Sequence, residues 1–77
     1  MSRKIKLIWE FYGTDAVETA KHHVVHLKEF GEKNKINLHA CDIEEQEQAA
    51  IAFMIVDETN MIAIRDSLRP KRGQWVD

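Results

Sequence analysis

The residues best suited to chemistry are three closely spaced histidines, His22, His23 and His26, within the segment 14–33. An imidazole can donate or accept a proton near neutral pH. His23 and His26 are therefore the candidate catalytic bases, and with Trp9 they are the candidate ligand-binding residues. No acidic partner for either base is identifiable, so a partly buried His23 bonded to backbone is the competing interpretation.

His22 and His26 form a second candidate site, because residues spaced i, i+4 lie on one face of a helix. They are the weak candidate metal ligands. The pair lacks the intervening glutamate of a zinc-protease motif, and Glu18 and Glu29 are only loosely placed beside it. A solvated polar face is the alternative, and we expect no metal and no other cofactor.

His39 and Cys41 alternate onto one face of a predicted strand over residues 35–43. They could be metal ligands or a thiol–imidazole pair, although i, i+2 neighbours rarely reach hydrogen-bonding geometry. We expect Cys41 to be a small apolar residue at a dimer interface. As the single cysteine, it excludes an intrachain disulfide.

The three clustered histidines belong to one predicted amphipathic helix over residues 14–33. At about 100° per residue, His23 falls on the apolar side, His26 on the flank and His22 outward. We expect the helix to end near residues 32–34, where polar residues follow Gly31. The apolar stripe recurs at spacings of three and four and consists of Val17, Ala20, Val24 and Leu27.

The remaining pattern predicts strands at residues 4–12, 35–43 and 49–57 and a short edge strand at 73–76. The third of these is apolar on both faces, which is typical of a strand covered on both sides. Alternation in the first strand directs Ile5, Leu7, Trp9 and Phe11 toward the helix, and in the second Ile36, Leu38 and Ala40. The expected core consists of Leu7, Trp9, Val24, Leu27 and Phe53.

Residues 61–68 are the ambiguous segment. Met61, Ile64 and Leu68 would make the apolar face of a short helix that Pro70 ends. The alternative is a hairpin in which residues 61–65 form a strand. We favour the helix.

Seventy-seven residues make one domain, 1–77, that buries only roughly 60% of its unfolded surface. Because a single helix layer covers one side of a small sheet, we expect a cytoplasmic homodimer joined through the other side. The net charge of −2 gives no reason to expect nucleic acid as a partner. The longest apolar run, residues 49–56, is too short to span a membrane.

The predicted order, β-α-β-β-α-β, defines an α+β, ferredoxin-like fold with a small antiparallel sheet and helices on one face. Through KLIWEF, HLKEF and IVDETNMIAIRDSLRP, the chain resembles the dimeric α+β barrel superfamily, which includes YCII-like domains and antibiotic-biosynthesis-type monooxygenases. The resemblance implies pairing through the sheets and a ligand cleft between sheet and helices. It also implies an active site made of a helix histidine and a strand aspartate. His23 or His26 would be the histidine. Asp42 lies at a strand end and is no clear counterpart of the aspartate.

Three functions remain open. The leading hypothesis is a non-catalytic module that binds a small-molecule ligand or another protein chain. The alternative is a cofactor-independent enzyme, an oxygenase or isomerase, with His23 or His26 as base. A weak metal-binding protein using His22 and His26 is the third. A cleft packed shut beneath the first helix would favour the module, and an open cleft with an acid near His23 the enzyme.

Overall fold

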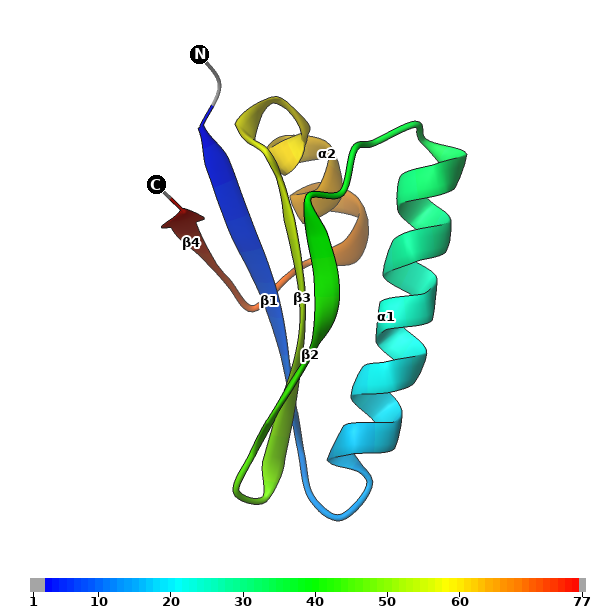
Figure 1. Cartoon of the computed structure of the whole chain (residues 1–77), viewed down its shortest axis with the longest axis vertical. Helices are drawn as coiled ribbons and strands as arrows, with labels where there is room; N and C mark the ends of the chain where they lie inside the picture. The colour runs from blue at the N-terminus through cyan, green and yellow to red at the C-terminus, as the bar shows by residue number, and fades with distance from the viewer. Residues whose placement is uncertain (1–2, 77) are drawn as a thin grey trace.

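The computed structural model describes residues 3–76 and has the predicted element order (Figure 1). A short 3₁₀ turn, η1, precedes the second helix. The bounds are β1 (Lys4–Tyr12), α1 (Ala16–Lys33), β2 (Ala40–Gln46), β3 (Ala49–Asp57), η1 (Glu58–Asn60), α2 (Met61–Leu68) and β4 (Arg72–Val76). The strands form one antiparallel sheet in the order β2-β3-β1-β4, compatible with a small ferredoxin-like fold. Neither helix within residues 3–76 has the length and apolarity needed to cross a membrane.

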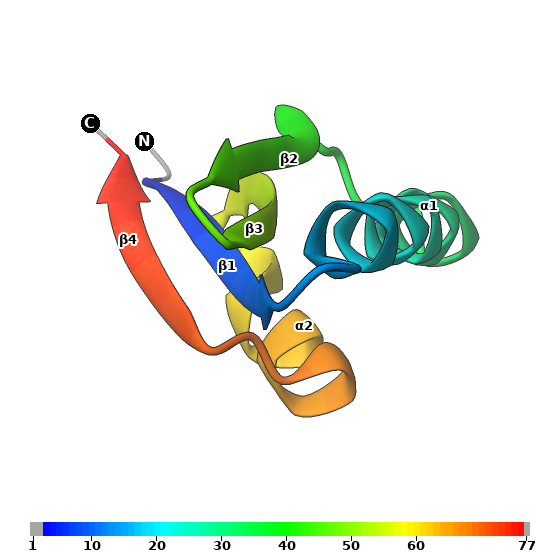
Figure 2. The same cartoon turned by 90° about the horizontal axis from the view of Figure 1, so that it is seen from below.

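Both helices lie on the same side of the sheet, which has β2 and β4 at its edges (Figure 2). On this helix side, large residues of β1 stand beside small residues of β3: Trp9 pairs with Ala52, and Phe11 with Ala50. The alanines leave room for the indole and the phenyl ring beneath α1. The helix-side core consists of Ile5, Leu7, Trp9, Ala16, Ala20, Val24, Leu27, Ala50, Ala52, Met54, Val56 and Ile64, all buried.

The second helix packs on this core through Ile64, Met61 and Leu68 and is joined to it by one hydrogen bond. Ile64 is fully buried, and the Trp9 Nε1–H donates to the Leu68 carbonyl oxygen at 2.8 Å. The helix then ends at Arg69, whose φ of 48° is left-handed, immediately before Pro70. The helical interpretation of residues 61–68 is therefore confirmed over the hairpin, because a helix buries Ile64 while Pro70 stops its extension.

The opposite side of the sheet, called the open face below, has no described helix or strand over it. Its centre is apolar: Ile8 and Ile51 are buried, and Phe53 and Ile55 are partly buried. Ile8 and Ile51 do not belong to the helix-side core, since alternation turns them to the other surface of the sheet. Charged side chains of the sheet itself surround this centre.

The prediction for the second strand was wrong in its bounds and its faces. Instead of 35–43, β2 spans Ala40–Gln46 and includes much of the expected acidic loop. A tight turn at Glu47 and Gln48 sets the hairpin register with β3, and that register turns Cys41 toward the helix-side core and Ala40 toward the open face. Cys41 is therefore absent from the expected sheet-to-sheet interface. An edge strand tolerates the acidic residues because its open face is solvated.

The expected core was correct except for Phe53. Leu7, Trp9, Val24 and Leu27 are buried in the helix-side core, whereas Phe53 pairs with Ile8 on the open face. The pattern of β3 did not reveal its orientation, because both of its faces are apolar.

We expect Leu27→Ala to destabilise the fold by about 2–5 kcal/mol, because the leucine is fully buried beneath α1. Thermal denaturation followed by circular dichroism would measure the loss. Val25→Ala is the matched control, since Val25 lies two residues away and is 53% exposed; it should change stability by less than about 0.5 kcal/mol. Equal effects of the two variants would contradict the assignment of the buried helix face.

Candidate functional site

His23 lies where α1 packs on β1, against two aromatic rings. Its ring centroid is 5.0 Å from that of Trp9 and 5.5 Å from that of Phe11. The alternation of β1 places both aromatic residues on the helix side, and the helix period brings His23 over them. Trp9 is fixed in turn by its hydrogen bond to the Leu68 carbonyl oxygen. The predicted association of His23 with Trp9 is thus present in the structure.

The immediate surroundings of His23 oppose charge on its ring. The Nε2 atom is buried and has no hydrogen-bond partner among the described residues. Burial lowers the pKa of His23, and the nearby imidazole of His26 adds to that lowering. A neutral imidazole is the form that a general base needs, but the nitrogen faces packed protein instead of an acid that would orient it.

Beneath α1 the space is filled. Ala20 and Leu27 have no exposed surface, and Val24 is 7% exposed. Within residues 3–76, no ion pair or hydrogen bond connects His23 to a carboxylate. The space beneath α1 is therefore packed, and no described acid orients the His23 ring.

His26 and His22 are both exposed on α1, on the solvent side of the helix. His26 does not share the aromatic contact that His23 makes. Among residues 3–76, no group of three or more histidine, cysteine or carboxylate side chains comes together as metal ligands. Two exposed imidazoles on one helix would offer a divalent ion only part of a coordination shell.

A histidine–carboxylate pair does occur, at a place the sequence did not indicate. The His39 Nε2 lies 3.0 Å from the Asp57 Oδ1, at the end of the sheet where β2 begins and β3 ends. The pair was missed because it depends on the β2–β3 register, and the predicted second strand began five residues too early. A correct hairpin alignment, counted back from the turn at Glu47 and Gln48, would have revealed it.

The His39–Asp57 pair alone is not sufficient for catalysis. A carboxylate can orient an imidazole as a base, but a nucleophile or a substrate site must lie beside it. Cys41 is nearby in sequence, yet it packs toward the helix-side core, and burial raises the pKa of its thiol. A protonated thiol is a poor nucleophile. The pair joins the start of β2 to the end of β3.

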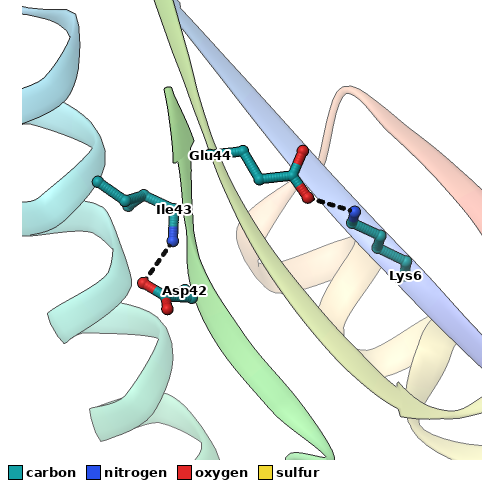
Figure 3. Close-up of polar contacts among 4 residues, drawn as sticks. All are labelled: Lys6, Asp42, Ile43 and Glu44. Atoms are coloured by element: carbon teal, nitrogen blue, oxygen red, sulfur yellow. Dashed lines mark hydrogen bonds and ion pairs between the residues drawn. The ribbon is translucent and has the colours of Figure 1, made fainter. Parts of the chain in front are cut away.

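Asp42, the imperfect counterpart of a catalytic aspartate, is separated from His23 by the sheet. Its pairing with Phe53 places it on the open face, whereas His23 packs on the helix side. The Asp42 Oδ1 accepts a hydrogen bond from the Ile43 backbone N–H at 2.7 Å (Figure 3). The histidine and aspartate that the resemblance requires in one site are therefore not brought together.

Charged residues of the open face form a bridge over its apolar centre. The Lys6 Nζ lies 2.9 Å from the Glu44 Oε1, so the lysine reaches across β3 to β2 (Figure 3). On the way it lies 4.4 Å from the centroid of the Phe53 ring. The aliphatic part of a lysine can cover apolar surface while its ammonium group remains bonded. This Lys6–Glu44 bridge explains why Phe53 is only partly exposed.

A second charged cluster lies at the C-terminal end of β1. The Tyr12 hydroxyl donates to the Glu10 Oε2 at 2.7 Å, and the Lys71 Nζ lies 3.8 Å from the Glu10 Oε1. The pKa of Glu10 is lowered, first by the Tyr12 hydrogen bond and then by the positive charges of Lys71 and Arg72. Glu10 is thus neutralised within its own chain.

Neither of two surface hollows on residues 3–76 involves the histidine site. One, of about 670 Å³, lies between the β1–α1 turn and the β2–β3 hairpin and is lined by residues 12–14 and 46–49. The other, of about 410 Å³, lies between α2 and β4. Its deepest residues, Ile5 and Leu7, are only 5% and 3% exposed, so they offer a ligand little apolar surface. Trp9, His23 and His26 line neither hollow.

Comparisons of the chain with protein-family models, with curated proteins and with solved structures find no match. The resemblance to the dimeric α+β barrel superfamily therefore stays a prediction.

His23 should have a lower pKa than a histidine of the unfolded chain, because burial disfavours its imidazolium form. The unfolded histidine takes up a proton near pH 6.5, whereas the folded one stays neutral to lower pH. Stability is therefore complete above about pH 6.5, and it falls as the pH drops from there toward the folded pKa.

Nuclear magnetic resonance titration of the imidazole protons would measure the pKa, and urea unfolding at several pH values the stability. His23→Gln should remove the pH-dependent loss that this residue causes, while His22→Gln should retain it. A His23 that titrates at the pH of an unfolded histidine would refute the buried position.

Proposed function

We propose that this chain is a non-catalytic interaction module that acts as a homodimer joined through the open face. The observation that carries this proposal is the two-sided apolar character of β3. Its Ala52 and Met54 belong to the helix-side core, while Ile51 and Phe53 form the centre of the open face. A central strand of this kind is stabilised when both of its surfaces are covered.

The chain covers only one of these surfaces with secondary structure. Within residues 3–76, both helices lie on the helix side, and side chains alone screen Ile8 and Ile51 on the other. A domain of this size has little other surface to bury. A second copy supplies a matching apolar centre. In a twofold-symmetric pair, one contact covers the open face of both chains.

The geometry of the candidate site supports an interaction module over an enzyme. Catalysis by His23 would need an open cleft and an orienting acid, and the space around it is packed and without an acid. Small-ligand binding would need an accessible apolar pocket. The hollow between α2 and β4 has a nearly buried floor, and it offers a ligand little apolar surface.

The Lys6–Glu44 bridge sets a condition on the interface. Its side chains are 20% and 48% exposed, so a partner over the open face would remove the remaining solvent from both. Burying an ion pair is tolerable when its partners remain bonded to each other, and costly when one is left alone. The bridge should thus stay closed in the dimer and form part of the interface.

Sedimentation at micromolar concentration should give about twice the 9.0 kDa chain mass. Phe53→Glu should shift the chain toward monomer, because it places a carboxylate in the centre of the proposed interface. The adjacent Lys6 can pair with that carboxylate in the monomer, so the variant should remain folded. We expect the dissociation constant to rise by at least about tenfold.

Val25→Glu is the matched control, since Val25 is an exposed apolar residue on the outer side of α1. It should leave the dimer intact. Circular dichroism verifies the fold of both variants. A wild-type chain that is monomeric up to millimolar concentration would refute the proposed function, as would a folded Phe53→Glu variant that dimerises as well as the wild type.

A further inference from the structure

One row of residues crosses the open face from edge to edge. The strand registers pair Asp42 of β2 with Phe53 of β3, Phe53 with Ile8 of β1, and Ile8 with Arg72 of β4. Directly paired residues on neighbouring strands present their side chains on the same face. The row therefore has an acid at one end, two apolar residues in the middle and a base at the other end.

The two charges at the ends of this row cannot neutralise each other within one chain. Asp42 and Arg72 are separated by three strand spacings of about 4.8 Å, or roughly 14 Å. Both are exposed, and within residues 3–76 neither takes part in an ion pair. The Asp42 Oδ1 accepts a hydrogen bond from the adjacent Ile43 amide (Figure 3), and no hydrogen bond to its Oδ2 occurs within residues 3–76.

The charges of the two neighbouring rows are already bonded within the chain. Lys6 and Glu44 form the Lys6–Glu44 bridge with each other, and Glu10 is bonded by Tyr12 and Lys71. One row further on, Lys4 adds a base to β1, next to β4. Among residues 3–76, the open-face charges outside ion pairs are therefore an acid at the β2 edge, Asp42, and bases toward the β4 edge, Arg72 and Lys4.

Two sheets that pack face to face are related by a twofold axis lying between them. When the strands are roughly aligned, two orientations of that axis are available. An axis parallel to the strands puts β2 of one chain over β4 of the other, acid over base. An axis perpendicular to the strands puts β2 over β2 and β4 over β4, like charge over like charge. Apolar burial is similar in both, so charge decides between them.

We propose that the homodimer has its twofold axis parallel to the strands, above the seam between β3 and β1. Asp42 then faces Arg72 of the partner subunit, and Phe53 lies over the partner's Ile8. The symmetric contact occurs twice, at the two rims of the interface. This inference rests on the proposed dimer through the open face, and it adds how the second copy is recognised and oriented.

Charge reversal tests the orientation. Asp42→Lys alone and Arg72→Glu alone should each weaken the dimer about tenfold, because each turns two attractive rim pairs into repulsive ones. The double variant Asp42→Lys/Arg72→Glu should recover wild-type affinity, since its charges are exchanged between the two ends of the row. Glu29→Lys, an exposed reversal on α1, is the control and should have no effect.

Mixing separates the two axis orientations. Isotopically labelled wild type and the double variant are combined at low salt, and native mass spectrometry counts the mixed dimers. With the proposed axis, a mixed dimer sets Asp42 of the wild type against the carboxylate introduced at position 72. It also sets the wild-type Arg72 against the lysine introduced at position 42, so the two chains should sort into separate homodimers. With the perpendicular axis, mixed dimers pair opposite charges and should exceed the statistical share. At about 0.5 M salt, screening should restore statistical mixing.

Each other outcome overturns the inference in a distinguishable way. A preference for mixed dimers refutes the axis orientation while the open-face dimer survives. Statistical mixing at low salt, with single reversals that do not weaken the dimer, places the interface away from this row. A wild-type monomer refutes the proposed function as well. If Asp42→Lys unfolds the chain because it loses the Ile43 hydrogen bond, Asp42→Asn replaces it, since the amide oxygen can still accept that bond. Arg72→Glu alone should then weaken the dimer, and adding Asp42→Asn should relieve the repulsion between positions 42 and 72.

Discussion

The two-sided apolar character of β3 is the constraint on which the rest of the structure depends. The strand lies next to the centre of the sheet, and each of its faces requires a different kind of cover. On the helix side, Ala50 and Ala52 admit the large rings of Phe11 and Trp9 beneath α1. A slip of one residue would exchange these alanines for Ile51 and Phe53. The register with β1 is therefore set by side-chain size.

The same packing accounts for the chemical character of His23. The aromatic contacts that hold its ring also exclude water and a carboxylate from its buried nitrogen. A histidine in these surroundings contributes shape and apolar contact, at the cost of a polar atom without a partner. Its histidine neighbours on the helix, His22 and His26, meet solvent instead. A sequence cluster of histidines has thus been divided between two environments.

The open face has a different balance of forces. Its apolar centre is small and is screened by the Lys6–Glu44 bridge, so in the proposed homodimer apolar contact would give affinity with little directional preference. Direction would come from Asp42 and Arg72 at the two edges, which are too far apart to pair within one chain. Such charges contribute modestly to affinity, but they distinguish one arrangement of two chains from another. Affinity and orientation would therefore come from different residues of one surface.

The sequence by itself determined the elements whose patterns are local. The period of α1 placed Ala20, Val24 and Leu27 in the core and His23 beside them, and the alternation of β1 placed Leu7 and Trp9 there as well. The spacing of Met61, Ile64 and Leu68 before Pro70 favoured a helix over a hairpin, and the structure has that helix as α2. These features depend on side chains a few residues apart, whose relative directions are set by helix and strand geometry alone.

Only the tertiary structure decided what depends on register between distant segments. The turn at Glu47 and Gln48 shifted β2 to Ala40–Gln46, and this shift turned Cys41 inward and brought His39 to Asp57. The orientation of β3 was equally undetermined, because a strand that is apolar on both faces gives no local sign of which face meets the helices. That choice followed from the fit of Trp9 against Ala52, a contact between residues far apart in the chain, and it moved Phe53 from the expected core to the open face.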